Sequence, residues 1–227
     1  MKNELNIVPL FSHVAHPCQF DLTEEQTKTL VEIADKEEYK VNGTYVSGTT
    51  IVAGGSEEEV LLKNDSDLKG AQSKNVHILN LPELDFLKTI LLNQFNKFKD
   101  IILRYENTDF KINTSWFTRT APGHQGVYHT HNNTMYSGVF YFNNVEETPT
   151  TTFSMFNLNT SYLIEPIEFN NWNCTTWKFA PKNNECIYFP SHLPHILDKN
   201  TSNEIRYSLA FNIIPMGTIG WRDSQNV

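Results

Sequence analysis

The sequence has few cysteines and no long apolar run. Its three cysteines, Cys18, Cys174 and Cys186, are odd in number, scattered and without a C-x-x-C pair. This pattern predicts free thiols in a reducing cytosol rather than a disulfide framework. No apolar stretch approaches the roughly 20 residues that span a bilayer, and residues 1–18 lack the apolar region of a secretory signal. We therefore expect a cytoplasmic protein with no membrane contact.

Positive charge is also scarce. The 227 residues include 18 Lys and Arg against 26 Asp and Glu, a formal net charge of -8. Binding to a nucleic-acid backbone depends on Lys and Arg, so this balance disfavours nucleic acid as the main partner. The length suits one substantial domain. We expect residues 1–108 to form a helical support region, residues 109–215 a β-rich core, and residues 216–227 a tail.

Two helices are predicted in the first half of the chain. Thr23 and Gln26 have the capping-box spacing and predict a helix from Thr23 to about Tyr39. A second helix is predicted from Asn80 to about Tyr105, where apolar residues recur every three or four positions. These apolar residues, predicted to face the core, are Leu84, Leu87, Leu91, Phe95, Phe98, Ile102 and Tyr105.

After Asp109 the pattern changes to short runs of β-branched and aromatic residues separated by turns, such as "KINTSWFTRT", "SGVFYF" and "ECIYFP". Several short strands at this spacing predict a sandwich or barrel whose outer face the helices cover. The long connection between Asn157 and Asn184 carries Trp172 and Trp177. Connections of this length are often functional, so it is either a lid or substrate loop, or a surface loop without such a role.

Two histidines one residue apart, His129 and His131, precede one of these runs in "VYHTHNNTMYSGVFYF". On a strand, residues i and i+2 point to the same face, so both imidazoles can converge on one ion. Imidazole is a common ligand for Fe, Zn, Cu and Ni. A single H-x-H pair is a weak signal, and two polar residues in a loop are the alternative interpretation.

A second candidate group lies in "FPSHLPHILDKNTSNEIRYSLAFN", which contains His192, His195, Arg206 and Ser208. Alternation in the last ten residues places Arg206 and Ser208 on one strand face. An Arg is costly to bury without an anionic partner, so these two side chains predict a bound carboxylate. The alternatives are an Arg on a solvated edge strand, or one paired with Glu204 or another acid.

The order H-x-H, a distal His, then Arg-x-Ser eleven residues later resembles the Fe(II)/2-oxoglutarate-dependent oxygenases. More narrowly, "YHTH", "SGVFYF", "FPSHLPH" and "RYSLAFN" resemble their putative-hydroxylase branch, common in phages and marine bacteria. The resemblance implies a mainly β fold with helices: a double-stranded β-helix, or jelly roll, buttressed by N-terminal helices. It also implies a location in the host cytoplasm if a phage encodes the chain.

The resemblance assigns His129, His131 and His195 to the metal, as catalytic centre and ligands, and leaves His192 as a non-ligand. It assigns Arg206 and Ser208 to the far carboxylate of 2-oxoglutarate. The common triad is two histidines and a carboxylate, and His131 stands at the carboxylate position. A direct three-His site and a site in which water replaces His131 both stay open.

The activity implied by the resemblance needs Fe(II), O2 and 2-oxoglutarate. Oxidative decarboxylation to succinate and CO2 would accompany hydroxylation of a peptide or small-molecule substrate, for example at a prolyl side chain. Near the mouth of the site, Tyr141 and Asn113 are expected to contact the co-substrate or substrate, together with Trp116 and Tyr128. Two alternatives remain: a cupin-like three-His dioxygenase that does not use 2-oxoglutarate, and a non-catalytic jelly-roll module.

Overall fold

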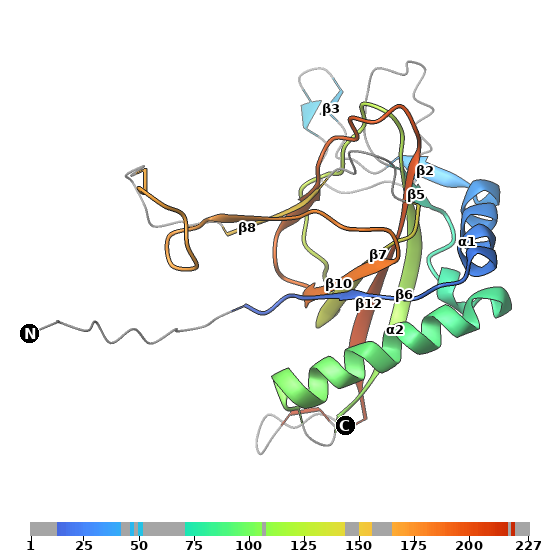
Figure 1. Cartoon of the computed structure of the whole chain (residues 1–227), viewed down its shortest axis with the longest axis horizontal. Coiled ribbons are helices and arrows are strands. Elements are labelled where there is room, and N and C mark those ends of the chain that lie inside the picture. The colour runs from blue at the N-terminus through green and yellow to red at the C-terminus, as the bar shows by residue number, and fades with distance from the viewer. Residues whose placement is uncertain are drawn as a thin grey trace, which may run out of the picture.

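The computed structural model describes residues 13–41, 46–47, 50–51, 71–105, 108–143, 150–155, 165–217 and 219–220. Two helices lie against one side of a body of β-strands (Figure 1). The helices are α1 (Glu24–Lys36) and α2 (Asp85–Phe98), and α2 is preceded by two 3-10 turns, η1 (Ile78–Asn80) and η2 (Pro82–Leu84). No helix among these residues is long and apolar enough to cross a membrane. The three cysteines are free thiols.

The strands form a seven-stranded antiparallel sheet, a three-stranded sheet and a small hairpin. The large sheet has the order β1-β10-β7-β12-β6-β5-β2, the small sheet β11-β8-β9, and the hairpin pairs β3 with β4. Their bounds are β1 His16–Gln19, β2 Tyr39–Val41, β3 Val46–Ser47, β4 Thr50–Ile51, β5 Ala71–Ser73, β6 Asp109–Thr120, β7 Tyr136–Tyr141, β8 Thr151–Ser154, β9 Thr176–Phe179, β10 Glu185–Pro190, β11 His195–Leu197 and β12 Arg206–Met216. The predicted jelly-roll class, mainly β with helices outside, is confirmed.

Strand β12 separates two apolar cores. Its residues Tyr207, Leu209 and Phe211 face the helices and join the larger core, which also contains the buried stripe of α2. Alternate residues of the same strand face the small sheet, where Ala210 joins a second core built from both sheets. Side chains of a strand alternate between its faces, so β12 contributes to both cores.

Both predicted helices form, and the start of α1 agrees with its sequence signal. Thr23 Oγ1 accepts a hydrogen bond from the Gln26 backbone N–H (3.2 Å), and Gln26 Oε1 accepts one from the Thr23 N–H (2.9 Å). The predicted capping box is therefore present.

The second helix is shorter than predicted. It changes to a π turn over η3 (Lys99–Leu103), and Arg104 then ends it in the left-handed conformation, with a φ of 54°. The apolar stripe stays buried as far as Phe98, whereas Ile102 is 56% exposed. The prediction that Ile102 faces the core is wrong, because a π turn has i→i+5 bonds and rotates the following residues out of the 3.6-residue phase.

Helix α2 packs through aromatic side chains of its C-terminal half. The Phe95 ring lies 5.2 Å from the Phe110 ring and 5.4 Å from the Tyr136 ring, measured between centroids. The buried Tyr188 hydroxyl donates to the Leu91 carbonyl oxygen at 2.8 Å, which ties β10 to α2. This layer holds the large sheet in place from outside, so the opposite face of the sheet is left for the site.

Gly138 of β7 has a close packing requirement. A Cβ at this position would lie 2.2 Å from the Phe211 ring. We predict that Gly138→Ala lowers the free energy of unfolding by about 1–3 kcal/mol or more, the usual cost of overpacking. Urea denaturation measures this. Gly217→Ala is the control, because Gly217 has no neighbour within 4 Å and a φ of +75°, so alanine there meets only backbone strain. Equal losses in the two variants would contradict the packing argument.

Candidate metal centre

Two of the three candidate histidines lie opposite each other across a backbone bridge. His129 and His195 exchange both backbone hydrogen bonds at 3.0 Å, and the His131 N–H donates to the Ser191 carbonyl at 2.9 Å. The prediction that both imidazoles share one face rests on a strand at His129 and His131, but residues 125–131 do not form a regular strand. The backbone of this segment forms only scattered hydrogen bonds with β11, and the one at His129 is an isolated bridge. The histidines nonetheless share one side.

A glycine allows this segment to approach β11. The Gly126 N–H donates to the Leu197 carbonyl at 2.8 Å, and a Cβ on Gly126 would lie 2.8 Å from the Leu197 Cβ. Only glycine fits this approach without displacing β11.

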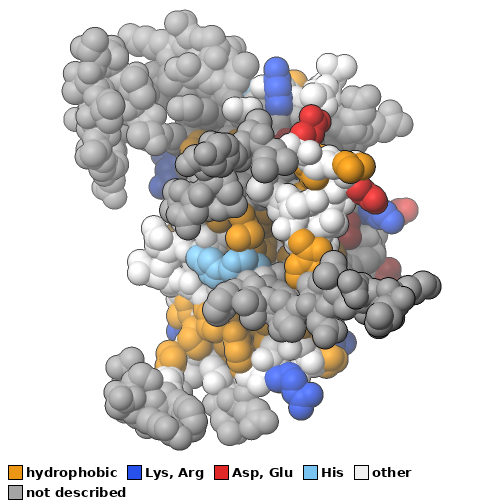
Figure 2. All heavy atoms as spheres, turned by 90° about the vertical axis from the view of Figure 1, so that its left-hand side faces the viewer, with side chains coloured by type: hydrophobic (Ala, Val, Ile, Leu, Met, Phe, Trp, Pro, Cys, Tyr) orange, Lys and Arg blue, Asp and Glu red, His pale blue; other side chains and the backbone are white. Residues whose placement is uncertain are grey.

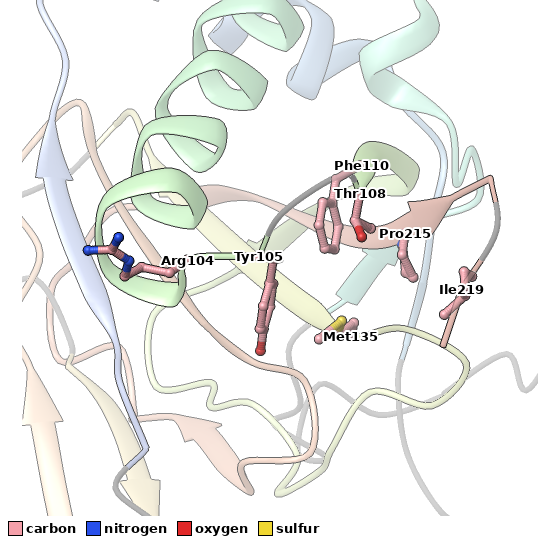
Figure 3. A pocket seen from close by; sticks show the side chains of 7 residues that line it. All are labelled: Arg104, Tyr105, Thr108, Phe110, Met135, Pro215 and Ile219. Atoms are coloured by element: carbon pink, nitrogen blue, oxygen red, sulfur yellow. The ribbon is translucent and has the colours of Figure 1, made fainter. Parts of the chain in front are cut away.

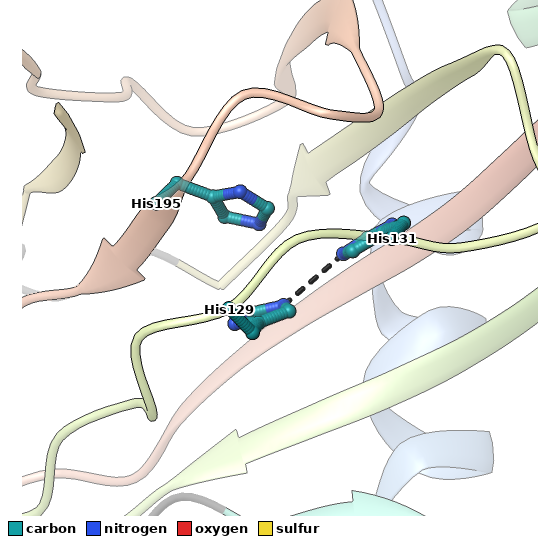
Figure 4. A group of neighbouring side chains, drawn as sticks. All are labelled: His129, His131 and His195. Atoms are coloured by element: carbon teal, nitrogen blue, oxygen red, sulfur yellow. Dashed lines mark hydrogen bonds between the residues drawn. The ribbon is translucent and has the colours of Figure 1, made fainter. Parts of the chain in front are cut away.

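The three imidazoles converge (Figure 4). His129 Nε2 and His131 Nε2 are 3.1 Å apart, and the ligand nitrogens of His129, His131 and His195 all lie within 4.8 Å of one another. Metal–imidazole bonds of about 2.1 Å place two ligands at right angles about 3.0 Å apart. The His129–His131 separation therefore fits two adjacent positions on one ion.

Each ring turns its other nitrogen towards an oxygen. His129 Nδ1 donates to the Val127 carbonyl (2.6 Å), and His195 Nδ1 donates to the Leu193 carbonyl (2.9 Å). His131 Nδ1 lies 2.7 Å from the side-chain oxygen of Asn212. When Nδ1 carries the proton, Nε2 of a neutral imidazole is a bare acceptor. Three acceptors then face one another, an arrangement that a cation satisfies and neutral histidines alone do not.

Burial keeps two of these rings neutral. It lowers the pKa of His131 to about 4, with the Asn212 hydrogen bond opposing the shift and His129 adding to it. Burial, followed by the charge of His129, lowers the pKa of His195 to about 3. At neutral pH both imidazoles are therefore unprotonated, the form that binds metals.

Aromatic rings surround the cluster on the inside of the sandwich. The Phe189 ring centroid lies 4.8 Å and the Phe153 centroid 5.8 Å from that of His195, and Trp116 lies 5.5 Å from His131. Figure 2 shows histidine side chains on one face of the molecule, with hydrophobic side chains above and below them, and His129 is exposed. The centre is therefore open on one side, and aromatic rings line part of its inner wall.

The second group of predicted residues lies inside the same sandwich. Arg206 is fully buried, and its guanidinium carbon is 5.6 Å from the centroid of the Tyr141 ring. Burial lowers the pKa of Arg206 to about 10, with Tyr141 and Asp198 acting in the opposite direction, so the side chain stays a cation at neutral pH. Ser208 lies opposite Tyr141 in the β12–β7 pairing.

Tyr141 also connects the two sheets. Its hydroxyl is 2.5 Å from Thr151 Oγ1 on β8. Burial raises the pKa of Tyr141 to about 12, with Arg206 opposing the shift. The phenol therefore stays protonated and can donate a hydrogen bond next to the guanidinium.

Strand register gives the distance between the histidines and this polar group. In the β11–β8 pairing His195 lies opposite Phe153, and Leu197 lies opposite Thr151. Thr151 is thus two residues from the level of His195, about 7 Å at about 3.3 Å per residue. That length is comparable to an extended five-carbon dicarboxylate.

The other predicted residues take different positions. Asn113 is exposed at the bulge of β6, and among the described residues it makes no hydrogen bond to the histidines or to Arg206. Tyr128 is half-buried. The exposed His192 packs its ring 5.0 Å from that of His13 and lies outside the three-histidine group.

Part of the predicted lid, residues 157–164, lies outside the described residues. Downstream of it, four large apolar side chains are exposed: Ile167, Phe169, Trp172 and Trp177.

A pocket of about 590 Å³ lies elsewhere, near the end of the π turn (Figure 3). It is lined by Arg104, Tyr105, Thr108, Phe110, Met135, Pro215 and Ile219. It shares no residue with the histidine cluster or with the Arg206 group. The chemistry proposed below does not involve it.

Sequence reasoning missed three polar side chains that complete the centre: Asn212, Ser137 and Thr151. Asn212 shares a strand face with Arg206 and Ser208 by simple alternation, which is the one sequence signal that could have indicated it. Nothing in the sequence indicated that it reaches His131, 81 positions away.

Comparison with known proteins agrees with this geometry. Residues 114–212 match the family model of the putative 2OG-Fe(II) oxygenases, a span that runs from β6 into β12 and includes the three histidines, Arg206 and Ser208. The resemblance to the Fe(II)/2-oxoglutarate oxygenases is confirmed. No curated protein matches the chain in sequence.

Solved structures of this oxygenase class share the fold. A prolyl-4-hydroxylase from Pseudomonas putida is 14% identical, with a TM-score of 0.53 over 88% of this chain and 93% of that one. A Trichoplax adhaerens prolyl hydroxylase, solved with a hypoxia inducible factor peptide, is 10% identical, with a TM-score of 0.54 over 88% and 83%. HygX from Streptomyces hygroscopicus, solved with nickel and 2-oxoglutarate, is 7% identical, with a TM-score of 0.55 over 92% and 85%. At these identities the likeness concerns the fold alone.

The two histidines of β11 and its preceding turn give a matched pair of variants. We predict that His195→Ala abolishes Ni(II) binding, because it removes one of three converging nitrogens, whereas His192→Ala leaves it unchanged. Calorimetry on the purified protein measures both, and circular dichroism checks the fold. Stoichiometric binding by His195→Ala would contradict the assignment of that ligand.

The lowered pKa values also predict a pH dependence of the metal-free protein. When folding lowers the pKa of a histidine, the unfolded state takes up a proton at a higher pH than the folded state does. The contribution of that histidine to stability is therefore fully present above pH 6.5 and is lost as the pH falls towards the folded pKa. Between pH 6 and 4 we expect His195 alone to contribute a slope of about 1 kcal/mol per pH unit. Urea unfolding across this range should show a shallower slope for His195→Gln than for the wild type. Equal slopes would contradict a buried, neutral His195.

Proposed function

We propose that this protein is an Fe(II)- and 2-oxoglutarate-dependent dioxygenase that hydroxylates a second substrate while converting 2-oxoglutarate to succinate and CO2. One observation carries the proposal. Three imidazole nitrogens converge, and in the same sandwich a buried guanidinium lies against Tyr141, whose hydroxyl contacts Thr151, two residues along β8 from the partner of His195. The match of residues 114–212 to the oxygenase family supports it.

His129, His131 and His195 would hold the iron. Bound iron supplies the redox chemistry, with O2 as the oxidant. The hydrogen bonds from each Nδ1 fix the rings, so that the three Nε2 atoms are in place before the metal binds.

The co-substrate would be held at its far carboxylate by Arg206 and Ser208. Arg presents a planar fork that matches a carboxylate, and a charge-assisted contact is stronger than a neutral one. The Tyr141 hydroxyl, 2.5 Å from Thr151 Oγ1, lies at the same end of the sandwich. Ala210 lies between Ser208 and Asn212 on the inner face of β12, and Asn212 is the residue that reaches His131. The small side chain of Ala210 leaves room for the carbon chain of 2-oxoglutarate.

Charge favours an anionic co-substrate. Three neutral imidazoles bring no negative charge to a divalent cation, whereas the commoner triad includes a carboxylate. A dicarboxylate would supply the missing charge at the metal and at Arg206 together. The ring of Phe153, Phe189 and Trp116 would exclude water from the reacting end.

The second substrate would enter from the open face. The substrate class we propose is a prolyl or other amino-acid side chain of a peptide, or a small molecule. The Trichoplax enzyme was solved with a peptide and HygX with hygromycin B, which are ligands of these two kinds. The free thiols support a cytoplasmic location, in the host cell if a phage encodes the chain.

A second candidate is a cupin-like dioxygenase with a three-His metal centre that does not use 2-oxoglutarate. The specific observation in its favour is His131, which stands where the commoner triad has a carboxylate. The two candidates differ in whether the Arg206 group binds 2-oxoglutarate, so one binding experiment separates them.

Arg206→Leu tests the co-substrate directly. Losing one partner of a buried charged contact costs about 2–5 kcal/mol, so the dissociation constant of 2-oxoglutarate should rise roughly 30-fold or more. Arg206→Lys should restore part of the affinity, because a point charge cannot reproduce the fork. Calorimetry on Mn(II)-loaded protein without O2 measures this, and Mn(II) affinity should not change.

The control is Arg119→Leu on the neighbouring strand. Arg119 lies opposite Tyr207 in the β12–β6 pairing, on the face towards the helices. Its loss should leave 2-oxoglutarate binding intact. Metal binding without any 2-oxoglutarate binding in the wild type would favour the cupin-like candidate, and unchanged affinity in Arg206→Leu would refute the proposed anchor.

A further inference from the structure

We infer that Asn212 is a positioning residue for His131, and that its uncharged amide sets the net charge of the metal centre. The inference rests on the proposed metal centre. Asn212 touches neither the metal position nor the proposed co-substrate anchor. It would act through the imidazole that it holds.

In the structure the amide oxygen of Asn212 faces His131. Its Oδ1 lies 2.7 Å from His131 Nδ1 and accepts a hydrogen bond from Ser137 Oγ at 2.9 Å. Its Nδ2 donates to Thr114 Oγ1 at 3.0 Å. The oxygen therefore faces His131 and the nitrogen faces β6. An acceptor at 2.7 Å requires the proton of a neutral His131 to be on Nδ1, which leaves Nε2 free for the cluster.

Ser137 completes the support. Its Oγ is 2.8 Å from His131 Nδ1 and 2.8 Å from Ser191 Oγ. Ser137 and Ser191 are buried, so this chain of hydroxyls joins β7 to the turn before β11. The hydroxyl can both donate to Asn212 and accept from Ser191, so every polar group in the chain has a partner.

His131 differs in this respect from the other two histidines. His129 and His195 each donate Nδ1–H to a backbone carbonyl two residues earlier, at Val127 and Leu193. Their orientation depends on local backbone alone. His131 depends on a side chain of another strand, so it is the ligand whose geometry a single substitution can change without disturbing the backbone.

The backbone of β12 places Asn212 at a defect in the sheet. The pairing of β12 with β6 shifts register between Asn212 and Ile213, which leaves Asn113 as the extra residue of β6. A bulge of this kind redirects the side chains next to it. Here it lies at the position from which β12 reaches His131.

An aspartate has the same shape as this asparagine and would accept the same hydrogen bond. It would also add a negative charge one imidazole away from the metal, and a carboxylate partner raises the basicity of a ligating histidine. The amide keeps the ring oriented without that charge. The set of protein ligands then stays neutral, and the negative charge that compensates the metal is left to the co-substrate.

The test uses two readouts that do not require turnover. Long-range 15N–1H NMR of the metal-free protein reports the tautomer of His131, and calorimetry at pH 8 reports the Ni(II) dissociation constant. The variants are Asn212→Leu, which removes the acceptor, and Asn212→Asp, which keeps the shape and adds charge. Asn203→Asp is the charge-matched control, because Asn203 is exposed in the turn before β12.

In the wild type we expect His131 to carry its proton on Nδ1. Asn212→Leu should mix the two tautomers and raise the Ni(II) dissociation constant roughly 10- to 100-fold, the usual effect of losing the partner of a ligating histidine. Asn212→Asp should keep the Nδ1–H tautomer and bind Ni(II) more tightly than the wild type, while Asn203→Asp should not change it. Circular dichroism verifies that each variant is folded.

Three results would overturn the inference. They are an Nε2–H tautomer of His131 in the wild type, an Asn212→Leu variant within twofold of wild-type Ni(II) affinity, and a loss of Ni(II) affinity in an additional Ser137→Ala variant but not in Asn212→Leu, which would assign the role to the serine. Failure of the wild type to bind Ni(II) would instead refute the proposed metal centre, and the tautomer of the metal-free protein would still decide whether Asn212 orients His131.

Discussion

The packing of the helices and the position of the candidate site both depend on strand β12, which pairs with β6 on one side and with β7 on the other. Buried in the middle of the large sheet, this strand sends alternate side chains to opposite sides. Tyr207, Leu209 and Phe211 pack under the helices, while Arg206 and Ser208 enter the sandwich. A shift of one residue in register would exchange these two sets, exposing the guanidinium to an apolar core. The helices and the candidate site are therefore fixed by the same hydrogen-bond ladder.

Charge is the second constraint on the interior. Burial holds His131 and His195 neutral, and Arg206 remains a buried cation. Asp198 acts on Arg206 electrostatically, but its carboxylate also accepts hydrogen bonds from Thr152 and lies 3.4 Å from Lys178 Nζ. An interior that holds a buried cation, and whose nearby carboxylate is shared with other partners, favours anionic ligands. Under the proposed function, one dicarboxylate would meet the positive charge at both ends of the cavity.

The three histidines are held in two different ways. Two of the proposed ligands, His129 and His195, lie on a backbone bridge, where both hydrogen bonds are 3.0 Å, and the third, His131, contacts Asn212 and Ser137. Backbone geometry thus sets two nitrogens and side-chain chemistry sets one. The centre can then differ in charge between related sequences through one side chain, without any change to the strands that carry it.

The sequence by itself determined the class of fold, the helix stripe as far as Phe98 and the capping box at Thr23, because these follow from local periodicity and local hydrogen bonds. It also predicted the residues proposed for the site, through spacing along the chain and resemblance. Only the tertiary structure decided that Ile102 turns to solvent, since a π turn depends on how the helix end packs. Likewise, the contacts of Asn212 and Thr151 arise from the register of strands that are far apart in sequence. Periodicity assigns a side chain to a face, but the partner it meets there is set by which strands pair and in what register.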